Sequence, residues 1–284
     1  MIFDSHAHLI SRDFDRYPTT PLSGIPLPPE QISSIVTAEE LIELMDANDI
    51  TRSLVVQRAH VYGFNNSYIV DSAEKYADRI NGMCMVDGLN PETPEKVREW
   101  VKRGAIAIRM TEPHKGAGPE WFSSEQAIKV WEVAEELGVS VRLHFYGWNR
   151  DVCLPALIKL MERFTSVPTV VDHLSSPLPT LGTGGIDELL VQLSAFKNVS
   201  LLVSTINFRR IADAGHSTAA VLQRAIDVFG SDRIMWGSDI AQSAGDYKEM
   251  IALALEATSS LSDVDRENVL YNTGNKLYGA DVKA

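Results

Sequence analysis

The chain has 284 residues, of which 45% are hydrophobic and 23% charged, the composition of a globular protein that can bury a large core. Its net charge of −12, with no basic run to offset it, excludes a nucleic-acid surface, which needs a clustered basic face. No stretch approaches the roughly 18 apolar residues of a membrane span, and the polar "FDSHAH" leaves no room for a signal peptide. We therefore expect a soluble, cytoplasmic protein that binds neither nucleic acid nor a membrane.

Short apolar runs rich in Val, Ile and Leu recur along the chain and predict strands that are buried on both faces of a parallel sheet. The predicted strands are Ile2–Ser5, Ser53–Gln57, Ile80–Val86, Ala105–Met110, Val139–Phe145, Pro168–Asp172, Val199–Ser204 and Ile234–Gly237.

Helical patterns fill the gaps between these runs. Thr37 and Glu40 have the spacing of a capping box, Pro94 sits in the first turn of a second helix, and Gly138 follows a third. Further helices are predicted at Cys153–Phe164, Gly185–Phe196, Thr218–Phe229, Asp246–Ser259 and Asp263–Tyr271.

Eight strands, most of them followed by a helix, predict an α/β fold of the (β/α)8 TIM barrel type that occupies residues 1–284 as a single domain. A doubly wound open sheet is the weaker alternative, because no glycine-rich phosphate turn follows the first strand. Residues 11–36, with five prolines and little periodicity, would follow the first strand as a long lid or binding loop, or as a disordered spacer.

Polar side chains cluster where predicted strands end. His6 and His8 follow the first strand two residues apart, so period-2 geometry directs both to one face. His144, His173 and Asp239 end the fifth, sixth and eighth strands, at the catalytic face of a barrel. Neutral imidazoles with one carboxylate are ligand types for Zn²⁺ or a similar ion. The alternative for each residue alone is a hydrogen-bonded polar group at a strand end.

The segments "DSHAHL", "LHFYG", "VVDHLSSP", "MWGSDI" and "ENVLYNTGNKLYG" resemble the amidohydrolase superfamily in its amidohydrolase-related (amidohydrolase 2) branch. The region from "LVVQRAH" to "GMCMVD" is similar to the part of that branch that includes 2-pyrone-4,6-dicarboxylate lactonase and sugar lactonases. The resemblance covers essentially the whole chain and implies a (β/α)8 fold. It is specific for the superfamily and much less so for the reaction.

The resemblance also implies roles for individual residues. It makes His6, His8, His144, His173 and Asp239 the metal ligands. Many members carry a bridging lysine or glutamate at the fourth strand, where this chain has Arg109. We therefore expect at most one divalent metal ion, with zinc as the first candidate and manganese as the second. The pyrone dicarboxylate lactonase suggests a metal-free alternative, in which the histidines polarise the substrate directly.

Substrate binding is assigned to arginines and aromatic residues at the same rim, namely Arg109, Tyr146, Arg209 and Tyr62. Arg109 has a surface ion pair with Glu112 as its alternative, and of Arg209 and its neighbour Arg210 at least one is expected to be solvated. Asn65 and Asn66 are further candidates for the pocket. His60, His114 and His216 are interpreted as structural or surface residues.

The resulting hypothesis is a hydrolase that opens a small carboxylated or sugar-derived lactone, or a related ester. The catalytic residues are Asp239, His173 and His144, with Asp239 as general base and then acid. The runner-up is a metal-dependent, non-oxidative decarboxylase of an aromatic or muconate-type acid. A non-catalytic binding protein would leave the convergence of five ligand-type residues unexplained. The expected partner is a small-molecule substrate, and homo-oligomer formation is left open.

Overall fold

Eight parallel strands form one sheet in chain order in the computed structural model, which describes residues 1–284 apart from 26, 33, 177–184 and 280–284. The strands are β1 (Ile2–His8), β2 (Ile50–Val56), β3 (Ile80–Met85), β4 (Ala105–Thr111), β5 (Ser140–His144), β6 (Thr169–Val171), β7 (Val199–Ser204) and β8 (Ile234–Gly237). Beyond β8 the chain meets β1, where Asp239 N donates to His6 O at 2.7 Å and His8 N donates to Ile240 O at 3.2 Å. The sheet thus curls into the predicted (β/α)8 barrel.

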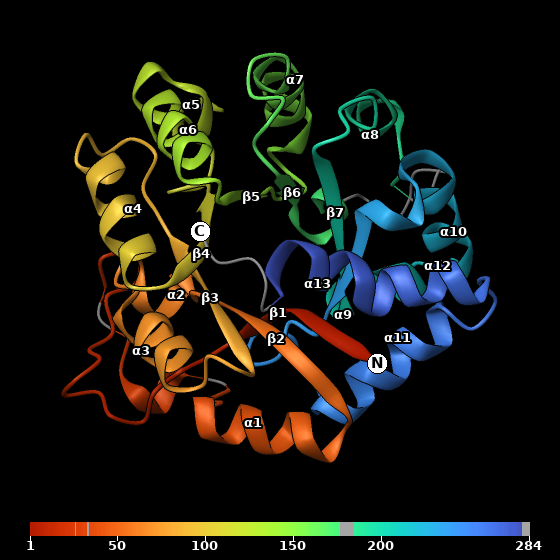
Figure 1. The fold of residues 1–284 in the computed structure, drawn as a ribbon, viewed down its shortest axis with the longest axis horizontal. Helices are drawn as coiled ribbons and strands as arrows, with labels where there is room; N and C mark the ends of the chain where they lie inside the picture. Colours follow the sequence, from red (N-terminus) through yellow and green to blue (C-terminus); the bar gives the residue numbers. More distant parts are fainter. Residues whose placement is uncertain (26, 33, 177–184, 280–284) are drawn as a thin grey trace.

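Most of the helices form a ring outside the strands and follow the chain order around it, whereas the C-terminal helix lies over the middle of the strands in this view (Figure 1). The helices are α1 (Ala38–Ala47), α2 (Ala59–Tyr62), α3 (Ser67–Lys75), α4 (Thr93–Lys102), α5 (Glu120–Ser123), α6 (Glu125–Leu137), α7 (Arg150–Met161), α8 (Glu188–Leu193), α9 (Thr205–Asp213), α10 (Thr218–Phe229), α11 (Tyr247–Ala257), α12 (Asp263–Glu267) and α13 (Thr273–Tyr278). Shorter turns are η1 (Pro29–Gln31), η2 (Asp172–Ser175), η3 (Ser231–Arg233) and a π-helical turn η4 (Asn268–Asn272).

All eight predicted strands are confirmed in position, and the capping signals also hold. Thr37 Oγ1 accepts from Glu40 N at 3.2 Å while Glu40 Oε2 accepts from Thr37 N at 2.8 Å, which is the predicted capping box of α1. Gly138 ends α6 with φ of 67°, a left-handed conformation that favours glycine. The predicted helix over 263–271 is broken, because η4 intervenes between α12 and α13. The helices α2, α3, α5, α9 and α13 were not predicted.

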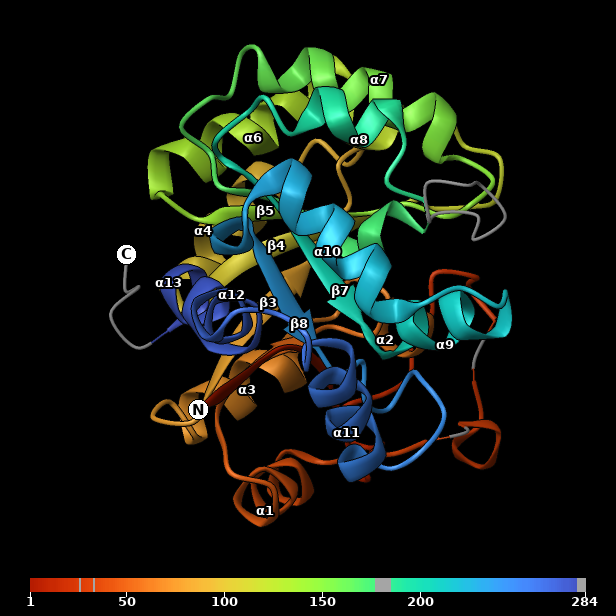
Figure 2. The same ribbon diagram turned by 90° about the vertical axis from the view of Figure 1, so that its right-hand side faces the viewer.

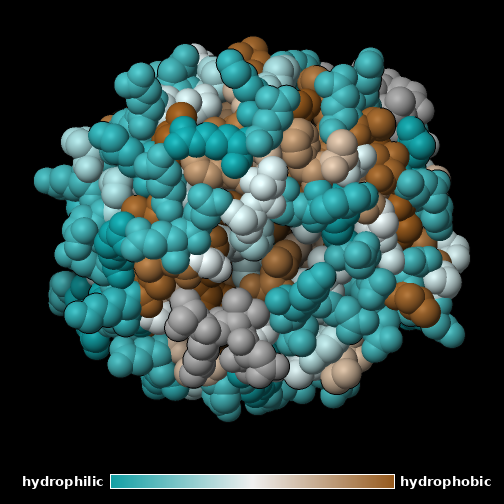
Figure 3. Space-filling model, turned by 45° about the horizontal axis from the view of Figure 1, so that its top comes forward, coloured by the Kyte–Doolittle hydropathy of each residue, from teal (hydrophilic) through white to brown (hydrophobic). Residues whose placement is uncertain are grey.

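Hydrophilic side chains predominate on the face shown in Figure 3, and hydrophobic ones appear as separate patches. Within the described ranges, no helix has both the length and the apolar character needed to cross a membrane.

The interior of the barrel is an apolar cluster to which strands all round the sheet contribute. Its members are Phe3, Leu54, Val56, Met83, Ala107, Val170, Leu202 and Met235, with Tyr278 of α13. The β5 contribution is Arg142, whose guanidinium lies 5.0 Å from the ring centre of Tyr278. Both views place α13 near the N-terminus, at the end of the barrel where the strands begin (Figures 1 and 2). Tyr278 therefore closes this end.

A register shift in β1 lets the same strand serve both the core and the opposite end of the barrel. Asp4 pairs with Ser53 and Ala7 with Val55, so β1 has one residue more than β2 over this stretch. Phe3 points into the barrel interior, and strict alternation would turn the histidine at position 6 outward. The extra residue re-aims the chain, as β-bulges do. His6 and His8, which sequence analysis put beyond the first strand, are its last inward-facing residues.

Tyr278→Ala should lower the free energy of unfolding by about 3–5 kcal/mol, because it opens a cavity under the barrel core and uncovers the Arg142 guanidinium. Tyr278→Phe is the matched control. It keeps the ring and removes only a 3.4 Å contact with Ser140 Oγ, so a change below about 1 kcal/mol is expected. Urea unfolding of both variants measures the difference, and equal effects would show that the ring does not close the barrel.

Candidate active site

A cavity of about 200 Å³ opens at the carboxyl ends of the strands, the end that carries the active site in barrel enzymes. Its lining residues are His8, Arg58, Ala59, His60, Arg109, Thr111, His144, Tyr146, Gly147, Trp148, His173, Ser176, Ile206, Arg210, Asp239 and Gln242.

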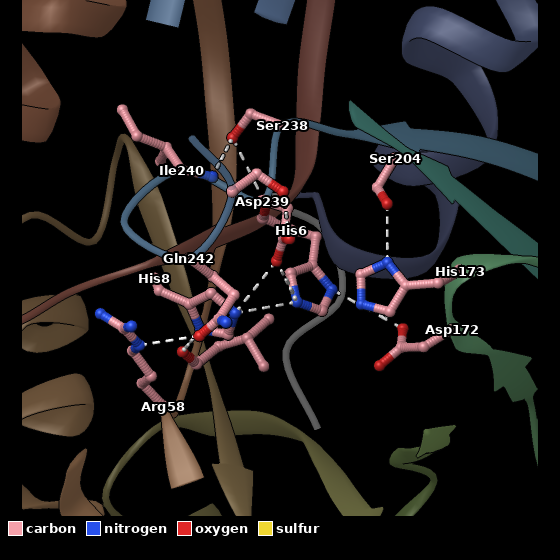
Figure 4. A network of polar contacts seen from close by, with 12 residues as sticks. His6, His8, Arg58, Asp172, His173, Ser204, Ser238, Asp239, Ile240 and Gln242 are labelled. Carbon is pink, nitrogen blue, oxygen red and sulfur yellow. Dashed lines mark hydrogen bonds and ion pairs between the residues drawn. The ribbon is translucent and has the colours of Figure 1, made fainter. Parts of the chain in front are cut away.

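Two imidazoles and a carboxylate meet at the base of this cavity (Figure 4). His6 Nε2 lies 3.2 Å from His8 Nε2, and Asp239 Oδ1 lies 3.6 Å from the first and 3.3 Å from the second. Ligand atoms about 2.0–2.1 Å from a tetrahedral Zn²⁺ are separated from one another by roughly 3.3 Å. The three atoms therefore have the spacing of one face of a metal coordination sphere, and all three side chains are buried.

The hydrogen bonds around His8 and Asp239 also suit metal binding. His8 Nδ1 donates to Val56 O at 2.7 Å, which leaves the lone pair on Nε2, as in a metal-binding histidine. Asp239 Oδ2 accepts from Ser243 Oγ at 2.7 Å, whereas the buried Oδ1 has no hydrogen-bond partner among the described residues. Burial acts to raise the pKa of the Asp239 carboxyl, but its contacts with His8 and the other imidazoles lower the pKa below its usual range. Asp239 is therefore ionised at neutral pH.

Asp4 fixes the relative position of β1 and the turn after β8. Asp4 Oδ1 accepts from His6 N at 3.1 Å and from Ser238 N at 2.8 Å. Its Oδ2 accepts from Ser238 Oγ at 2.6 Å and from the Tyr247 hydroxyl at 2.9 Å. One buried carboxylate thus ties His6 to the residue that precedes Asp239.

Asp172, the last residue of the predicted sixth strand, is a second buried carboxylate that sequence analysis did not single out. Its Oδ2 accepts from Arg109 Nε at 2.7 Å, and its Oδ1 lies 3.4 Å from Arg142 Nε and 3.6 Å from His6 Nδ1. Burial acts to raise the pKa of the Asp172 carboxyl, but the two guanidinium groups hold it well below its usual range. The only available signal was its position beside His173 at a strand end.

His173 and His144 lie beside the cluster of His6, His8 and Asp239. The ring centre of His173 is 5.0 Å from that of His6 and 5.3 Å from that of His144. Ser204 Oγ contacts His173 Nδ1 at 2.6 Å, and the backbone over 173–176 is left-handed, which is unusual for residues other than glycine. Burial lowers the pKa of His6, His144 and His173, so all three rings are neutral at pH 7.

The structure places four of the five predicted ligands in two overlapping groups. His6, His8 and Asp239 form the compact group, and His173 groups with His6 and Asp172. His144 belongs to neither group and lies on the cavity wall, with Tyr146 packed on its ring at 4.5 Å.

The predicted substrate-binding residues divide into two pairs. Arg109 and Tyr146 line the cavity, and the partner of Arg109 is Asp172 rather than the predicted alternative Glu112, which accepts from Trp148 Nε1 at 2.7 Å. Tyr62 and Arg209 are not part of the described lining.

Each of these two has a structural role instead. The buried Tyr62 hydroxyl accepts from Ser11 N at 2.9 Å, and Arg209 donates to Ala244 O in an exposed turn. Asn66 is buried, and its side chain bonds the backbone of Met85.

Sequence analysis did not assign three other residues to the wall, although it named Arg210 beside Arg209. Arg58 is held by Gln242 Oε1 at 2.9 Å, and Arg210 reaches the cavity where Arg209 does not. His60 also lines the mouth, whereas His114 and His216 are exposed residues outside it. Because these residues come from loops and short helices, no strand-end signal marked them.

The segment 11–36 is not a lid over the cavity, since none of its described residues lines the wall. It runs beside α2, where Thr20 N donates to Val61 O at 2.9 Å and Leu22 N donates to Ala59 O at 3.3 Å. Tyr17 is buried in the core, so this stretch packs as part of the fold.

Comparison with solved structures finds the same fold in proteins of low sequence identity. A probable 2-pyrone-4,6-dicarboxylic acid hydrolase from Acinetobacter baumannii with bound citric acid gives a TM-score of 0.73 at 18% identity, over 97% of this chain and 98% of that one. An amidohydrolase from Burkholderia multivorans with bound zinc gives 0.71 at 19% identity, over 98% of both chains. A manganese complex of 5-carboxyvanillate decarboxylase from Novosphingobium aromaticivorans gives 0.69 at 14% identity, over 98% and 95%.

Comparison with curated proteins gave no match. The amidohydrolase family model, in contrast, matches residues 3–280, which include the strands of the barrel and the histidine and aspartate residues at its carboxyl end. The chain therefore belongs to the amidohydrolase family.

Proposed function

We propose that the protein is a hydrolase that opens a small carboxylated or sugar-derived lactone, or a related ester. In this proposal the substrate is a small molecule bound in the cavity above His6 and His8. One divalent metal, zinc or manganese, is held by His6, His8 and Asp239. The two similar structures with bound zinc and manganese support this choice of metals.

The observation that carries the proposal is the free oxygen of Asp239. Asp239 Oδ1 is buried and ionised, has no hydrogen-bond partner among the described residues, and belongs to a side chain that lines the cavity. A carboxylate oxygen in this position can accept a proton from a water molecule as its oxygen attacks the substrate carbonyl carbon. The same carboxyl group then returns the proton to the alkoxide that leaves when the ring opens.

A bound divalent ion would polarise the carbonyl oxygen of the substrate as a Lewis acid. The spacing of His6 Nε2, His8 Nε2 and Asp239 Oδ1 fits such an ion, and a carboxylate oxygen has two lone pairs, so Oδ1 could bind the ion with one and accept the proton of water with the other. The neutral rings of His173 and His144 flank this position, where they can hydrogen bond to substrate oxygens.

Three arginines on the cavity wall suit a substrate carboxylate. Arg109, Arg58 and Arg210 line the cavity together, although the whole chain carries a net charge of −12. Arg109 uses Nε for Asp172, and a guanidinium has further N–H donors on its two terminal nitrogens. These donors can hold a carboxylate in a two-point contact, which orients the carbonyl group relative to Asp239.

Decarboxylation of an aromatic or muconate-type acid is the second candidate, because the decarboxylase with bound manganese has the same fold. The two reactions differ in their products. We expect a panel of carboxylated and sugar-derived lactones, incubated with the protein plus Zn²⁺ or Mn²⁺, to give ring-opened hydroxy acids and no CO2. Release of CO2 from an aromatic acid, with no lactone opened, would contradict the lactonase proposal.

Asp239→Asn should lower kcat by about 10²–10⁴-fold, because the amide can no longer take the proton from water. The matched control is Asp232→Asn, the same substitution at an exposed position before β8, which should leave kcat unchanged. Circular dichroism of both variants checks the fold. A near-wild-type kcat in the Asp239 variant would exclude the general-base role.

Arg109→Gln should lower kcat/KM by about 10–100-fold, mainly through KM, because a charged hydrogen bond to the substrate carboxylate is worth roughly 1.5–3 kcal/mol. Arg209→Gln is the control, since that arginine lies outside the described lining. Steady-state kinetics on the best lactone distinguish the two. Equal effects would show that this cavity wall is not the substrate site.

A further inference from the structure

His6 receives a hydrogen bond at the ring nitrogen that points away from Asp239. Arg142 Nη1 lies 3.1 Å from His6 Nδ1, and Arg142 also donates to Ser5 O at 2.9 Å. A guanidinium has only donors, so His6 Nδ1 must be the acceptor. The single proton of the neutral ring then lies on Nε2, the atom that faces His8 Nε2 at 3.2 Å.

This tautomer is the wrong one for a metal ligand. A neutral histidine that binds a metal through Nε2 carries its proton on Nδ1 and donates it to a carboxylate, a carbonyl or a water molecule. His8 meets this condition, because its Nδ1 donates to Val56 O at 2.7 Å. His6 would meet this condition only if its proton were on Nδ1 and were donated to Asp172 Oδ1. That oxygen lies 3.6 Å from Nδ1 and has no hydrogen-bond partner among the described residues.

Arg142 and Asp172 therefore compete for one nitrogen atom. We propose that Arg142 is a positioning residue that keeps the His6 proton on Nε2 and so weakens divalent metal binding by His6, His8 and Asp239, while Asp172 favours binding. Only the metal half of this inference rests on the proposed function, because the tautomer itself is a property of the metal-free protein.

The buried charges act in the same direction as the tautomer. Arg109 and Arg142 both pair with Asp172, so two positive charges already lie beside this carboxylate before any ion arrives. A divalent cation adds two positive charges beside two guanidinium groups, which is unfavourable where water does not screen them. Bound metal should therefore exchange readily with solution.

The first experiment measures the tautomer directly by ¹⁵N NMR of metal-free protein labelled on histidine. The His6 signals are those lost in His6→Gln. We expect His6 to be protonated on Nε2 and unprotonated on Nδ1. We expect His8 to be protonated on Nδ1 and unprotonated on Nε2. A protonated Nδ1 on His6 would overturn the inference without any variant of Arg142.

The second experiment measures Zn²⁺ affinity by competition with a chelator. Arg142→Met should raise the Zn²⁺ affinity about tenfold or more, because His6 Nδ1 is then free to carry the proton. The expected direction is unusual, since removing a residue that hydrogen bonds to a metal ligand usually lowers the affinity by about 10–100-fold. Asp172→Asn should lower it by a similar factor. Arg109→Met is the control. It also removes one positive charge from beside Asp172, but Arg109 makes no hydrogen bond to His6 among the described residues.

Two outcomes of the second experiment would contradict the inference. Equal gains in Zn²⁺ affinity in the Arg142 and Arg109 variants would show that charge alone causes the effect. A lower Zn²⁺ affinity in the Arg142 variant would show that Arg142 favours metal binding. Thermal unfolding confirms that each variant is folded. A wild-type protein that binds no Zn²⁺ would contradict the proposed metal, and the NMR pattern would still decide the tautomer.

Discussion

The junction of β1 with β8 is the contact on which both the barrel and its site depend. A side chain at Gly237 would place its Cβ only 2.5 Å from His6 Cβ, so the two strands approach this closely only because position 237 is glycine. Beyond it, Asp239 N bonds His6 O at 2.7 Å, and Asp4 bonds both His6 N and Ser238 N. The contacts that close the barrel are thus the contacts that set Asp239 beside the histidine pair.

The register shift of β1 explains how one short strand contributes to two regions of opposite character. Phe3 belongs to the apolar interior near α13, while His6, three residues later, faces a carboxylate at the other end of the barrel. On a regular strand, two residues that are three positions apart face opposite sides of the sheet. The extra residue between Asp4 and Ala7 is therefore needed for both Phe3 and His6 to face the inside of the barrel. The polar site consequently lies on an apolar floor that keeps water away from its base.

Sequence reasoning was most successful where periodicity carries the information. Apolar runs located all eight strands, and because parallel strands end on the same side of a barrel, His144, His173 and Asp239 could be grouped with His6 and His8. Arg142 is two residues before His144, so period-2 alternation already puts it on the same face of the strand, a signal that the sequence analysis did not use. Asp172 adjoins His173, so alternation would put it on the opposite face, and only the packing shows that it faces His6. Tyr62 and Arg209 failed as wall residues because a helix or loop position does not fix the direction of a side chain.

Asp172 divides the site into two halves. Arg109 and Arg142 both point into the interior, where two unpaired guanidinium groups would repel each other strongly, and Asp172 lies between them at 2.7 Å and 3.4 Å. With that charge shared, Arg109 can face the cavity and Arg142 can face His6. The same carboxylate therefore supports the proposed substrate contact on one side and opposes the Arg142 tautomer of His6 on the other.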